Sequence, residues 1–217
     1  MTSTIELSCN TLRCEIAPAL GASVAGLWLG DTPVLRSTPA STLTTVRQAG
    51  SYPLVPFSNR LGHATLIWAG TSHPLVQATG DEPHVIHGVG WQRPWAVLEA
   101  TAHFALLSYE HKPDAAWPFA FDASQGLDVD HCFDGWPEVV HLRDEVLHTR
   151  ITPNLNRLVV YTSTARDLVA IEPVSHVNNA VNLMASTGAS AAELGVCVLQ
   201  PGQSMSAEMN IQVERVA

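Results

Sequence analysis

The amino-acid sequence predicts an all-β protein, an antiparallel β-sandwich or barrel, with residues 1–217 forming a single domain. Short runs alternate polar and apolar side chains with a period of two, which is typical of a strand with one face in water. Fourteen glycines and fourteen prolines lie scattered between these runs and indicate frequent turns. A β fold of this length is routinely one domain, and neither an internal repeat nor a low-complexity linker divides the chain.

Most elements predicted along the chain are strands. They are expected at 11–17, 24–29, 102–109, 157–162, 167–172 and 206–213. Residues 195–199 run into Pro201-Gly202, where proline presets φ and glycine supplies a positive φ. We therefore expect 195–199 and 206–213 to form a closing hairpin. Only residues 178–186 favour a helix, of one or two turns.

The composition favours a well-packed globule that handles neutral ligands. Hydrophobic residues make up 46% of the chain and charged residues only 14%, which argues against disorder. The formal net charge is −9 and the pI is near 5.5, so a nucleic-acid partner is disfavoured. No stretch approaches the roughly 18 uninterrupted apolar residues of a membrane helix, so no membrane partner is expected.

The first residues and the cysteines favour a cytoplasmic location. The start of the chain, Met1-Thr-Ser-Thr, lacks the basic region and apolar run of a signal peptide. The cysteines form neither a CxxC pair nor a metal-ligand spacing; they are Cys9, Cys14, Cys132 and Cys197. Reduced thiols are expected, with a Cys9–Cys14 disulfide across a hairpin as the alternative. We expect no cofactor.

Asn59 and Arg60 follow an extended, proline-containing run that begins at Pro53. Arginine offers a rigid fork of donors, and asparagine both donates and accepts hydrogen bonds. The pair therefore suits a ligand rich in hydroxyl groups. A surface ion pair and an ordinary turn are the alternative interpretation.

His84 and His87 lie three residues apart, close to Gly88, Gly90 and Trp91. On a strand this spacing directs the two imidazoles to opposite faces, and no second pair follows, which disfavours a metal site. A sugar pocket fits better, because an aromatic face packs on ring C–H groups and an imidazole hydrogen-bonds a sugar oxygen. A metal-dependent β-barrel enzyme that uses both histidines and a carboxylate is the alternative.

Carboxylates occur in two further settings. Asp128, Asp130 and Asp134 are staggered as in a calcium loop, but the glycine and the terminal glutamate of such a loop are missing. Solvated loop carboxylates are the alternative there. Glu172 ends an apolar strand just before Pro173, at a rim where partial burial can raise its pKa into the range of a general base. For Glu172 the alternative is an exposed strand end.

Together and in this order, the motifs resemble those of the aldose 1-epimerase (galactose mutarotase) family. The likeness begins at residues 17–24 and covers most of the chain from both ends inward. Its segments are YPLVPFSNR (52–60), HGVGWQRPW (87–95), DHCFDGW (130–136), EPVSHVNNAVN (172–182) and LQPGQSM (199–205). Each segment alone is weakly specific, whereas the ordered set is strongly specific. The resemblance implies a galactose mutarotase-like β-supersandwich with an open sugar cleft.

The resemblance also implies a reaction, in which the anomers of a free aldose are interconverted. Glu172 is then expected to be the general base at the C1 hydroxyl, and His87 to sit near the ring oxygen. The substrate-binding residues that it implies are Asn59, Arg60, Asp130, Trp91 and His176. A monosaccharide is the expected ligand. A phosphorylated sugar is less favoured, because the eleven Lys and Arg residues form no obvious cluster in the sequence.

The chain departs from the family pattern between Phe121 and Asp130. There the family has a block of strands with a Gly-x-His-Pro-like motif, whose histidine is the general acid, and this sequence has no such motif. Loss of central strands leaves unpaired edges and an exposed apolar face, so we expect a reduced sandwich or a homodimer that covers the gap. The expected function is a mutarotase with His87 as the acid, or a catalytically impaired carbohydrate-binding protein of the same fold.

Overall fold

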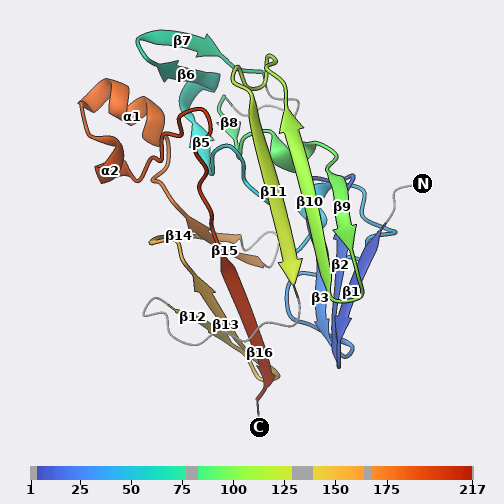
Figure 1. The fold of residues 1–217 in the computed structure, drawn as a ribbon. Helices are drawn as coiled ribbons and strands as arrows, with labels where there is room; N and C mark the ends of the chain where they lie inside the picture. Colours follow the sequence, from blue (N-terminus) through green and yellow to red (C-terminus); the bar gives the residue numbers. More distant parts are fainter. Residues whose placement is uncertain (1–3, 77–82, 129–138, 164–167, 217) are drawn as a thin grey trace. The chain divides into compact units, whose positions relative to one another are not determined.

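The computed structural model describes residues 4–76, 83–128, 139–163 and 168–216. Strands dominate these residues, which contain only two α-helices, both short (Figure 1). The predicted all-β fold is therefore confirmed. The described residues divide into two compact units: unit 1 holds 4–57, 75–76 and 86–128, and unit 2 holds 58–74, 83–85, 139–163 and 168–216. That residues 1–217 form one domain stays a prediction.

The elements are assigned to the two units as follows. The strands of unit 1 are β1 (Ile5–Cys9), β2 (Leu12–Ala17), β3 (Ser23–Leu29), β4 (Thr32–Pro33), β9 (Ala96–Ala100), β10 (Phe104–His111) and β11 (Phe121–Asp128). The strands of unit 2 are β5 (Arg60–Leu61), β6 (Thr65–Trp68), β7 (Thr71–Pro74), β12 (Val140–Arg143), β13 (Leu147–Pro153), β14 (Arg157–Ser163), β15 (Leu168–Val174) and β16 (Met209–Arg215). Unit 2 also holds the helices α1 (Ala180–Thr187) and α2 (Ala191–Leu194), and β8 (Val85–Ile86) begins in unit 2 and ends in unit 1.

In unit 1 the first four strands form an antiparallel meander in the order β1-β2-β3-β4 (Figure 1). Strand β3 is central to the core, because every residue from Ser23 to Trp28 is buried. Gly26 makes room for the Trp28 ring, since a Cβ there would lie 2.2 Å from that ring. The guanidinium of Arg13 lies 3.9 Å from the centre of the same ring. Packing on one aromatic side chain thus ties β2 to β3.

The second sheet of unit 1 has the order β11-β10-β9, and its longest ladder joins β10 to β11 over the full length of both strands. A backbone hydrogen bond of 2.8 Å from Ser8 N–H to the Ala102 carbonyl joins this sheet to the first one. Ala105 and Leu107, on one side of β10, have no exposed surface. The buried strand predicted at 102–109 is confirmed.

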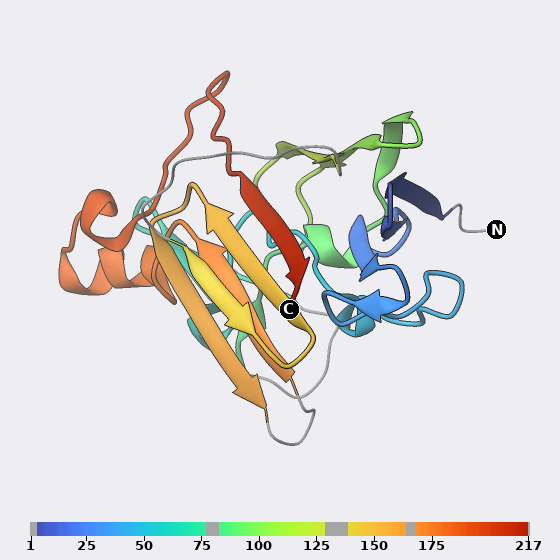
Figure 2. The same cartoon turned by 90° about the horizontal axis from the view of Figure 1, so that it is seen from below.

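In unit 2, β12, β13 and β16 form one antiparallel sheet, and β14 and β15 form another (Figure 2, where β16 is red). Strands β14 and β15 confirm the predictions at 157–162 and, for the described residues, at 167–172. The strand predicted at 206–213 exists as β16, and the turn at Pro201-Gly202 is confirmed, with Gly202 at a φ of +83°.

The closing hairpin is wrong, because β16 pairs with β13 and residues 195–199 form no strand. Helix α2 occupies the residues before this run and ends at Gly195, which has a φ of +74° and therefore breaks any extended ladder there. Strand β13 offers β16 a partner along its whole length, with an apolar face to bury. The long-range ladder is thus favoured over the local hairpin.

The helix predicted at 178–186 is confirmed by α1. Helix α2 is an addition to the predicted elements, although its signal is present in the sequence. Ser190 and Glu193 form a capping box, in which the Ser190 hydroxyl accepts from Glu193 N–H (3.3 Å) and the Glu193 carboxylate accepts from Ser190 N–H (2.8 Å). No helix in the described part of the chain is long and apolar enough to cross a membrane.

The β14–β15 sheet leaves an apolar face open. Leu158 and Val160 of β14 are 44% and 55% exposed, and Val169 of β15 is 50% exposed. Side chains alternate along a strand and Val169 pairs with Thr162, so these three apolar side chains lie on the same face. An exposed apolar face is what the loss of neighbouring strands leaves behind. That a homodimer covers it stays a prediction.

Gly88 is a position at which only glycine fits. Its φ is +64°, and a Cβ would lie 2.1 Å from the carbonyl oxygen of Val55. Gly70 has a similar φ of +75° but open space around it. We therefore expect Gly70→Ala to lower the free energy of unfolding by about 1 kcal/mol, and Gly88→Ala to lower it by roughly 3 kcal/mol or more. Urea denaturation of both variants measures the difference, and equal losses would contradict the close packing of Gly88.

Candidate functional site

Two segments far apart in the sequence meet in unit 2, one around Arg60 and the other directly after Glu172. The ring Nε2 of His176 accepts a hydrogen bond from the backbone N–H of Ser58 (3.3 Å). The side-chain Oδ1 of Asn178 accepts one from the backbone N–H of Arg60 (3.1 Å). Side chains of the second segment thus hold the backbone of the first.

Two further asparagines extend this set of hydrogen bonds. The Oδ1 of Asn179 accepts from Gly62 N–H (2.9 Å). Asn182, in α1, accepts from Ile67 N–H (2.9 Å) and donates through Nδ2 to the Thr65 carbonyl (2.7 Å). An amide side chain both donates and accepts, so it can satisfy an exposed strand edge as a neighbouring strand would. The backbone around β5 and β6 is therefore held from one side by asparagines.

Left-handed backbone occurs at the same places. In unit 2 Asn59, His63 and Asn179 have φ values of 57°, 53° and 58°, and in unit 1 His87 has a φ of 63°. For residues other than glycine such values store strain of order 1 kcal/mol, and they persist where the surrounding structure imposes them. Strain of this kind clusters at functional sites. Two of the predicted site residues, Asn59 and His87, carry it.

Glu172 lies in β15, directly opposite Val159 of β14. Its side chain is partly buried, and this burial raises the pKa of the carboxyl above its ordinary value. The positive charge of Arg60 acts in the opposite direction and is the smaller effect. The carboxyl is therefore a stronger base than an exposed glutamate, with a guanidinium near enough to influence it.

His176 uses both of its ring nitrogens within the chain. Nδ1 lies 2.8 Å from the carbonyl oxygen of Val177, which can only accept, so Nδ1 carries the proton. Nε2 is then the acceptor for the N–H and the hydroxyl of Ser58, at 3.3 and 3.5 Å. His176 therefore positions the Asn59–Arg60 segment. The expectation that it contacts a sugar has no support in these bonds.

In unit 1 His87 is held among aromatic rings. Its ring centroid lies 6.1 Å from that of Trp91 and 6.5 Å from that of Tyr52, edge to face in both cases. Tyr52 in turn stacks on Trp91 at 5.8 Å. Trp91 is only 1% exposed, and its Nε1 donates to the Gly88 carbonyl (3.2 Å). Trp91 is thus a packing residue that orients His87, and its burial does not support the expected contact between its face and a sugar.

His84 is engaged elsewhere. Its Nδ1 accepts from the backbone N–H of His63 (2.9 Å), and the two rings meet edge to face at 5.4 Å. Among the described residues, no three His, Cys, Asp or Glu side chains are grouped so that they could hold a metal ion. The alternative of a Cys9–Cys14 disulfide is wrong, because both thiols are reduced. Burial raises the pKa of the Cys14 thiol to about 12, which makes it unreactive.

The structure thus brings Asn59, Arg60 and Glu172 together in unit 2, with His176 as the residue that positions the first two. The last predicted substrate-binding residue, Asp130, lies outside the described residues, so its role stays a prediction.

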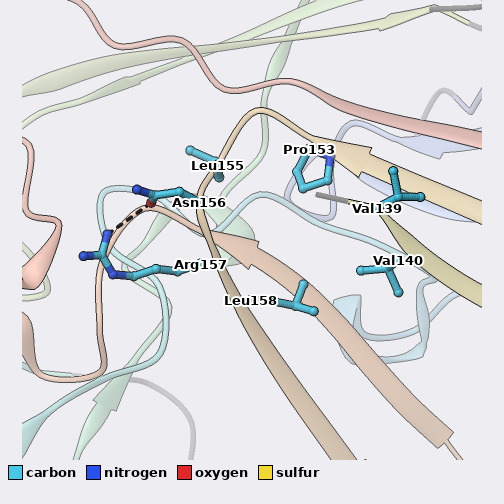
Figure 3. A pocket seen from close by; sticks show the side chains of 7 residues that line it. All are labelled: Val139, Val140, Pro153, Leu155, Asn156, Arg157 and Leu158. Atoms are coloured by element: carbon cyan, nitrogen blue, oxygen red, sulfur yellow. Dashed lines mark hydrogen bonds between the residues drawn. The ribbon is translucent and has the colours of Figure 1, made fainter. Parts of the chain in front are cut away.

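A surface hollow of about 270 Å³ lies elsewhere in unit 2 (Figure 3). It is lined by Val139, Val140, Pro153, Leu155, Asn156, Arg157 and Leu158. Leu158 and Val159 are adjacent in β14 and therefore point to opposite faces of the sheet, and Val159 shares its face with Glu172. The part of the hollow that Leu158 lines therefore borders the other face of this sheet, and none of the predicted site residues lines the hollow.

Comparison with known proteins decides the family. The family model described as aldose 1-epimerase matches residues 3–130. The chain belongs to the aldose 1-epimerase family. A curated relative of this family member is the uncharacterized protein YphB of Escherichia coli (strain K12), 31% identical over 106 residues, which are 49% of this chain and 36% of YphB. The match thus spans about a third of that relative's length.

Solved structures share the fold of this aldose 1-epimerase family member over almost all of its length. A candidate aldose 1-epimerase from Escherichia coli K12 superposes with a TM-score of 0.79 at 18% identity, and 100% of each chain is covered. A galactose mutarotase-like protein from Clostridium acetobutylicum superposes with a TM-score of 0.71 at 12% identity, and the match covers 100% of this chain and 96% of the other. The Slr1438 protein from Synechocystis sp. PCC 6803 superposes with a TM-score of 0.70 at 17% identity, and the match covers 98% of this chain and 96% of the other. The expected galactose mutarotase-like sandwich is confirmed.

One residue that supports the site in this aldose 1-epimerase family member gave no signal in the sequence. Arg157, at the start of β14, donates from Nη1 to the Ser175 carbonyl (2.8 Å) and from Nη2 to the Glu193 carbonyl (3.2 Å). It therefore braces the segment that follows Glu172. Its partners are backbone carbonyls 18 and 36 residues away in the sequence, and a local sequence pattern cannot predict contacts over such separations. The asparagines at 178–182, in contrast, were visible as an unusual density of amides.

Glu172→Gln should stabilise the fold at neutral pH. Burial raises the pKa of Glu172 in the folded state, so ionising this carboxyl costs more free energy in the folded chain than in the unfolded chain. That cost is absent below the unfolded-state pKa, grows as the pH rises, and is complete above the folded-state pKa. Because glutamine does not ionise, the variant should gain stability over the wild type as the pH rises.

Urea denaturation at about pH 3.5 and about pH 8 measures this difference. Glu99→Gln, at an exposed position in β9, is the matched control for the loss of a carboxylate. A gain in Glu172→Gln that is the same at both pH values would contradict the effect of burial on its pKa.

Proposed function

We propose that this protein interconverts the α and β anomers of a free aldohexose. The observation that carries the proposal is the setting of Glu172, a partly buried carboxyl with a raised pKa beside the Arg60 guanidinium. A base of this kind next to a rigid fork of donors suits the removal of a proton from a sugar hydroxyl. Membership of the aldose 1-epimerase family supports the same reaction.

In the proposed reaction Glu172 removes the proton from the C1 hydroxyl. The electron pair of that O–H bond forms the aldehyde C=O while the bond from C1 to the ring oxygen breaks, and the ring oxygen takes a proton from His87. The open-chain aldehyde turns about the C1–C2 bond. The former ring oxygen then attacks the other face of the carbonyl and returns its proton to His87, and the C1 oxygen recovers its proton from Glu172. Both residues end in their starting states.

His87 is assigned as the acid because the sequence lacks the family's general-acid motif and a histidine can donate a proton near neutral pH. The rings of Tyr52 and Trp91 lie edge to face beside its ring, and its backbone is left-handed. A preorganised acid of this kind contributes roughly 10²–10⁴-fold to a rate.

Asn59 and Arg60 are assigned to the sugar hydroxyls, with Asp130 as a third contact that the family resemblance implies. Arg60 is held on both sides of its Cα, since its N–H donates to Asn178 (3.1 Å) and its carbonyl accepts from Asn179 (3.1 Å). Its guanidinium has a second role, because its charge offsets part of the effect of burial on the pKa of Glu172. Arg60 therefore lets the carboxylate of Glu172 stay ionised down to a lower pH than burial alone would allow.

The interconversion of fresh α-D-glucose and α-D-galactose, followed by polarimetry against the uncatalysed rate, tests this function. Glu172→Gln and His87→Ala should each lower kcat by about 10²-fold or more, with the fold retained by circular dichroism. Glu99→Gln, the exposed matched control, should keep the wild-type turnover. Wild-type turnover in either site variant would remove that residue from the mechanism.

Arg60→Met should raise the pKa of Glu172 further, because the lost positive charge opposes the effect of burial. The acid limb of kcat/KM against pH, along which the base becomes protonated, should then move to higher pH. Arg60→Lys keeps the charge and should leave the limb near its wild-type position, while the loss of the two-pronged donor raises KM. An acid limb that does not move in Arg60→Met would mean that Glu172 is not the base.

Carbohydrate binding without catalysis is the second candidate function. It is favoured by the sequence, which contains no Gly-x-His-Pro-like motif. In that case a monosaccharide should raise the melting temperature of the wild type, and raise it less in Arg60→Ala, without accelerating anomer exchange. If sugars change neither the melting temperature nor the rate of exchange, both candidate functions are excluded for the sugars used.

A further inference from the structure

The sheet β12–β13–β16 of unit 2 has one buried face and one polar face. Along β13, Leu147, Thr149 and Ile151 are buried, while His148 and Arg150 between them are partly exposed. Side chains alternate along a strand, so His148 and Arg150 share the polar face. None of the residues on this face takes part in the proposed sugar site.

The register of β12 adds two more basic side chains to the same face. His141 lies opposite Arg150, and Arg143 lies opposite His148. Directly opposed residues of an antiparallel ladder point to the same side of the sheet. These four residues, His141, Arg143, His148 and Arg150, are named the basic face.

The basic face gathers positive charge in an acidic protein. The whole chain has eleven Lys and Arg against twenty Asp and Glu, yet two arginines stand here on neighbouring strands. Within the described part of the chain, neither the side chain of Arg143 nor that of Arg150 forms a hydrogen bond or an ion pair, and the Nε of Arg150 is buried without a partner. Both guanidinium groups are therefore left without an ion-pair partner within the described residues.

The acidic groups nearest the basic face form no ion pair with its arginines in the described part of the chain. Glu214 of β16 lies opposite His148 and accepts from its Nδ1 (2.9 Å). Asp144, in the turn between β12 and β13, accepts two backbone N–H groups of that turn at 2.7 Å, and these bonds lower the pKa of its carboxyl. Glu145 follows in the same turn and is exposed to solvent.

The two histidines form a hydrogen-bonded chain that ends at Glu214. His141 Nδ1 lies 2.8 Å from His148 Nε2, and His148 Nδ1 lies 2.9 Å from the Glu214 carboxylate. A carboxylate only accepts, so His148 Nδ1 carries one proton, and a second lies between the rings. When the pair holds just these two protons, the outer Nε2 of His141 is bare. A third proton places an N–H on that outer nitrogen, whichever ring holds the second.

We propose that the basic face binds a sulfate or phosphate group, with Arg143, Arg150 and the outer N–H of His141 as its donors. Guanidinium groups bind tetrahedral oxyanions with two parallel hydrogen bonds, and the two arginines lie on neighbouring strands of this face without a side-chain partner among the described residues. The negative charge of the ligand favours the third proton on the histidine pair, so binding is coupled to proton uptake. This inference does not depend on the proposed mutarotase activity.

Calorimetric titration of the full chain with sodium sulfate, against sodium chloride at equal ionic strength, tests the proposal. Sulfate is the probe because its own charge does not change near neutral pH. Arg143→Gln and Arg150→Gln should each weaken sulfate binding about tenfold or more. Lys112→Gln removes one positive charge at an exposed position of unit 1 and should bind sulfate as the wild type does.

Thermal unfolding checks that each variant is folded. If Arg150→Gln does not fold, Arg143→Gln carries the test, because Arg143 is exposed on the outer strand β12. The proposal is overturned if the wild type binds sulfate no more tightly than chloride, or if the double variant Arg143→Gln/Arg150→Gln binds sulfate like the wild type.

Titrations in two buffers of different ionisation enthalpy measure the proton uptake. The wild type should take up protons on binding sulfate near neutral pH. His141→Gln, which has no titratable nitrogen at the outer position, should bind more weakly and take up far fewer protons. Uptake equal to that of the wild type would contradict the role of the histidine pair.

Inorganic phosphate and glucose 6-phosphate distinguish the two sources of the oxyanion. Equal affinities mean that the phosphate group alone is recognised, and an affinity for the sugar phosphate about tenfold higher means that a phosphorylated small molecule is the ligand. Glucose 6-phosphate binding that survives the loss of both arginines would belong to another site and count against the basic face.

Discussion

Hydrogen bonds from side chains to the backbone of residues 58–67 are the constraint on which the candidate site depends. His176, Asn178, Asn179 and Asn182 satisfy backbone groups that the short strands β5 and β6 would otherwise leave to solvent on that side. Because the anchors are side chains and not a continuous strand, the anchored backbone can adopt left-handed conformations such as that of Asn59. The position of the Arg60 guanidinium beside Glu172 follows from this arrangement, and so does the opposition of two effects on the glutamate's pKa.

Those two effects act on the pKa of the Glu172 carboxyl in opposite directions. Burial in β15 makes the charged form of Glu172 less favourable, and the positive charge of Arg60 partly offsets this effect. Rigidity comes from Arg157, which joins the start of β14 to the Ser175 carbonyl and to the end of α2. The helix ends on a glycine because Gly195 has a φ of +74° and a Cβ there would lie 2.1 Å from the Ser175 carbonyl oxygen.

The two sheets of unit 2 leave faces of different character open. One face of β14–β15 is apolar and open, and the polar face of β12–β13–β16 carries two arginines without an acidic partner in the described residues. The first feature agrees with the exposed apolar face that the departure from the family pattern predicts, while the loss of strands stays a prediction. The second is a separate feature, because it arises from alternation and register on a complete antiparallel ladder.

Local chemistry in the sequence determined the all-β class, the positions of the strands β2, β3, β10, β14, β15 and β16, the turn at Pro201-Gly202 and the helix α1. It did so because alternation, turn residues and capping act over a few neighbouring residues. The order of the motifs further indicated the family and the candidate residues Arg60 and Glu172. Tertiary structure alone decided that β16 pairs with β13, that His176 and Trp91 are positioning and packing residues, and that four basic side chains share one face. These outcomes depend on register and burial, as in the contact between Ser58 and His176, which lie 118 residues apart, and no local pattern carries information over such a separation.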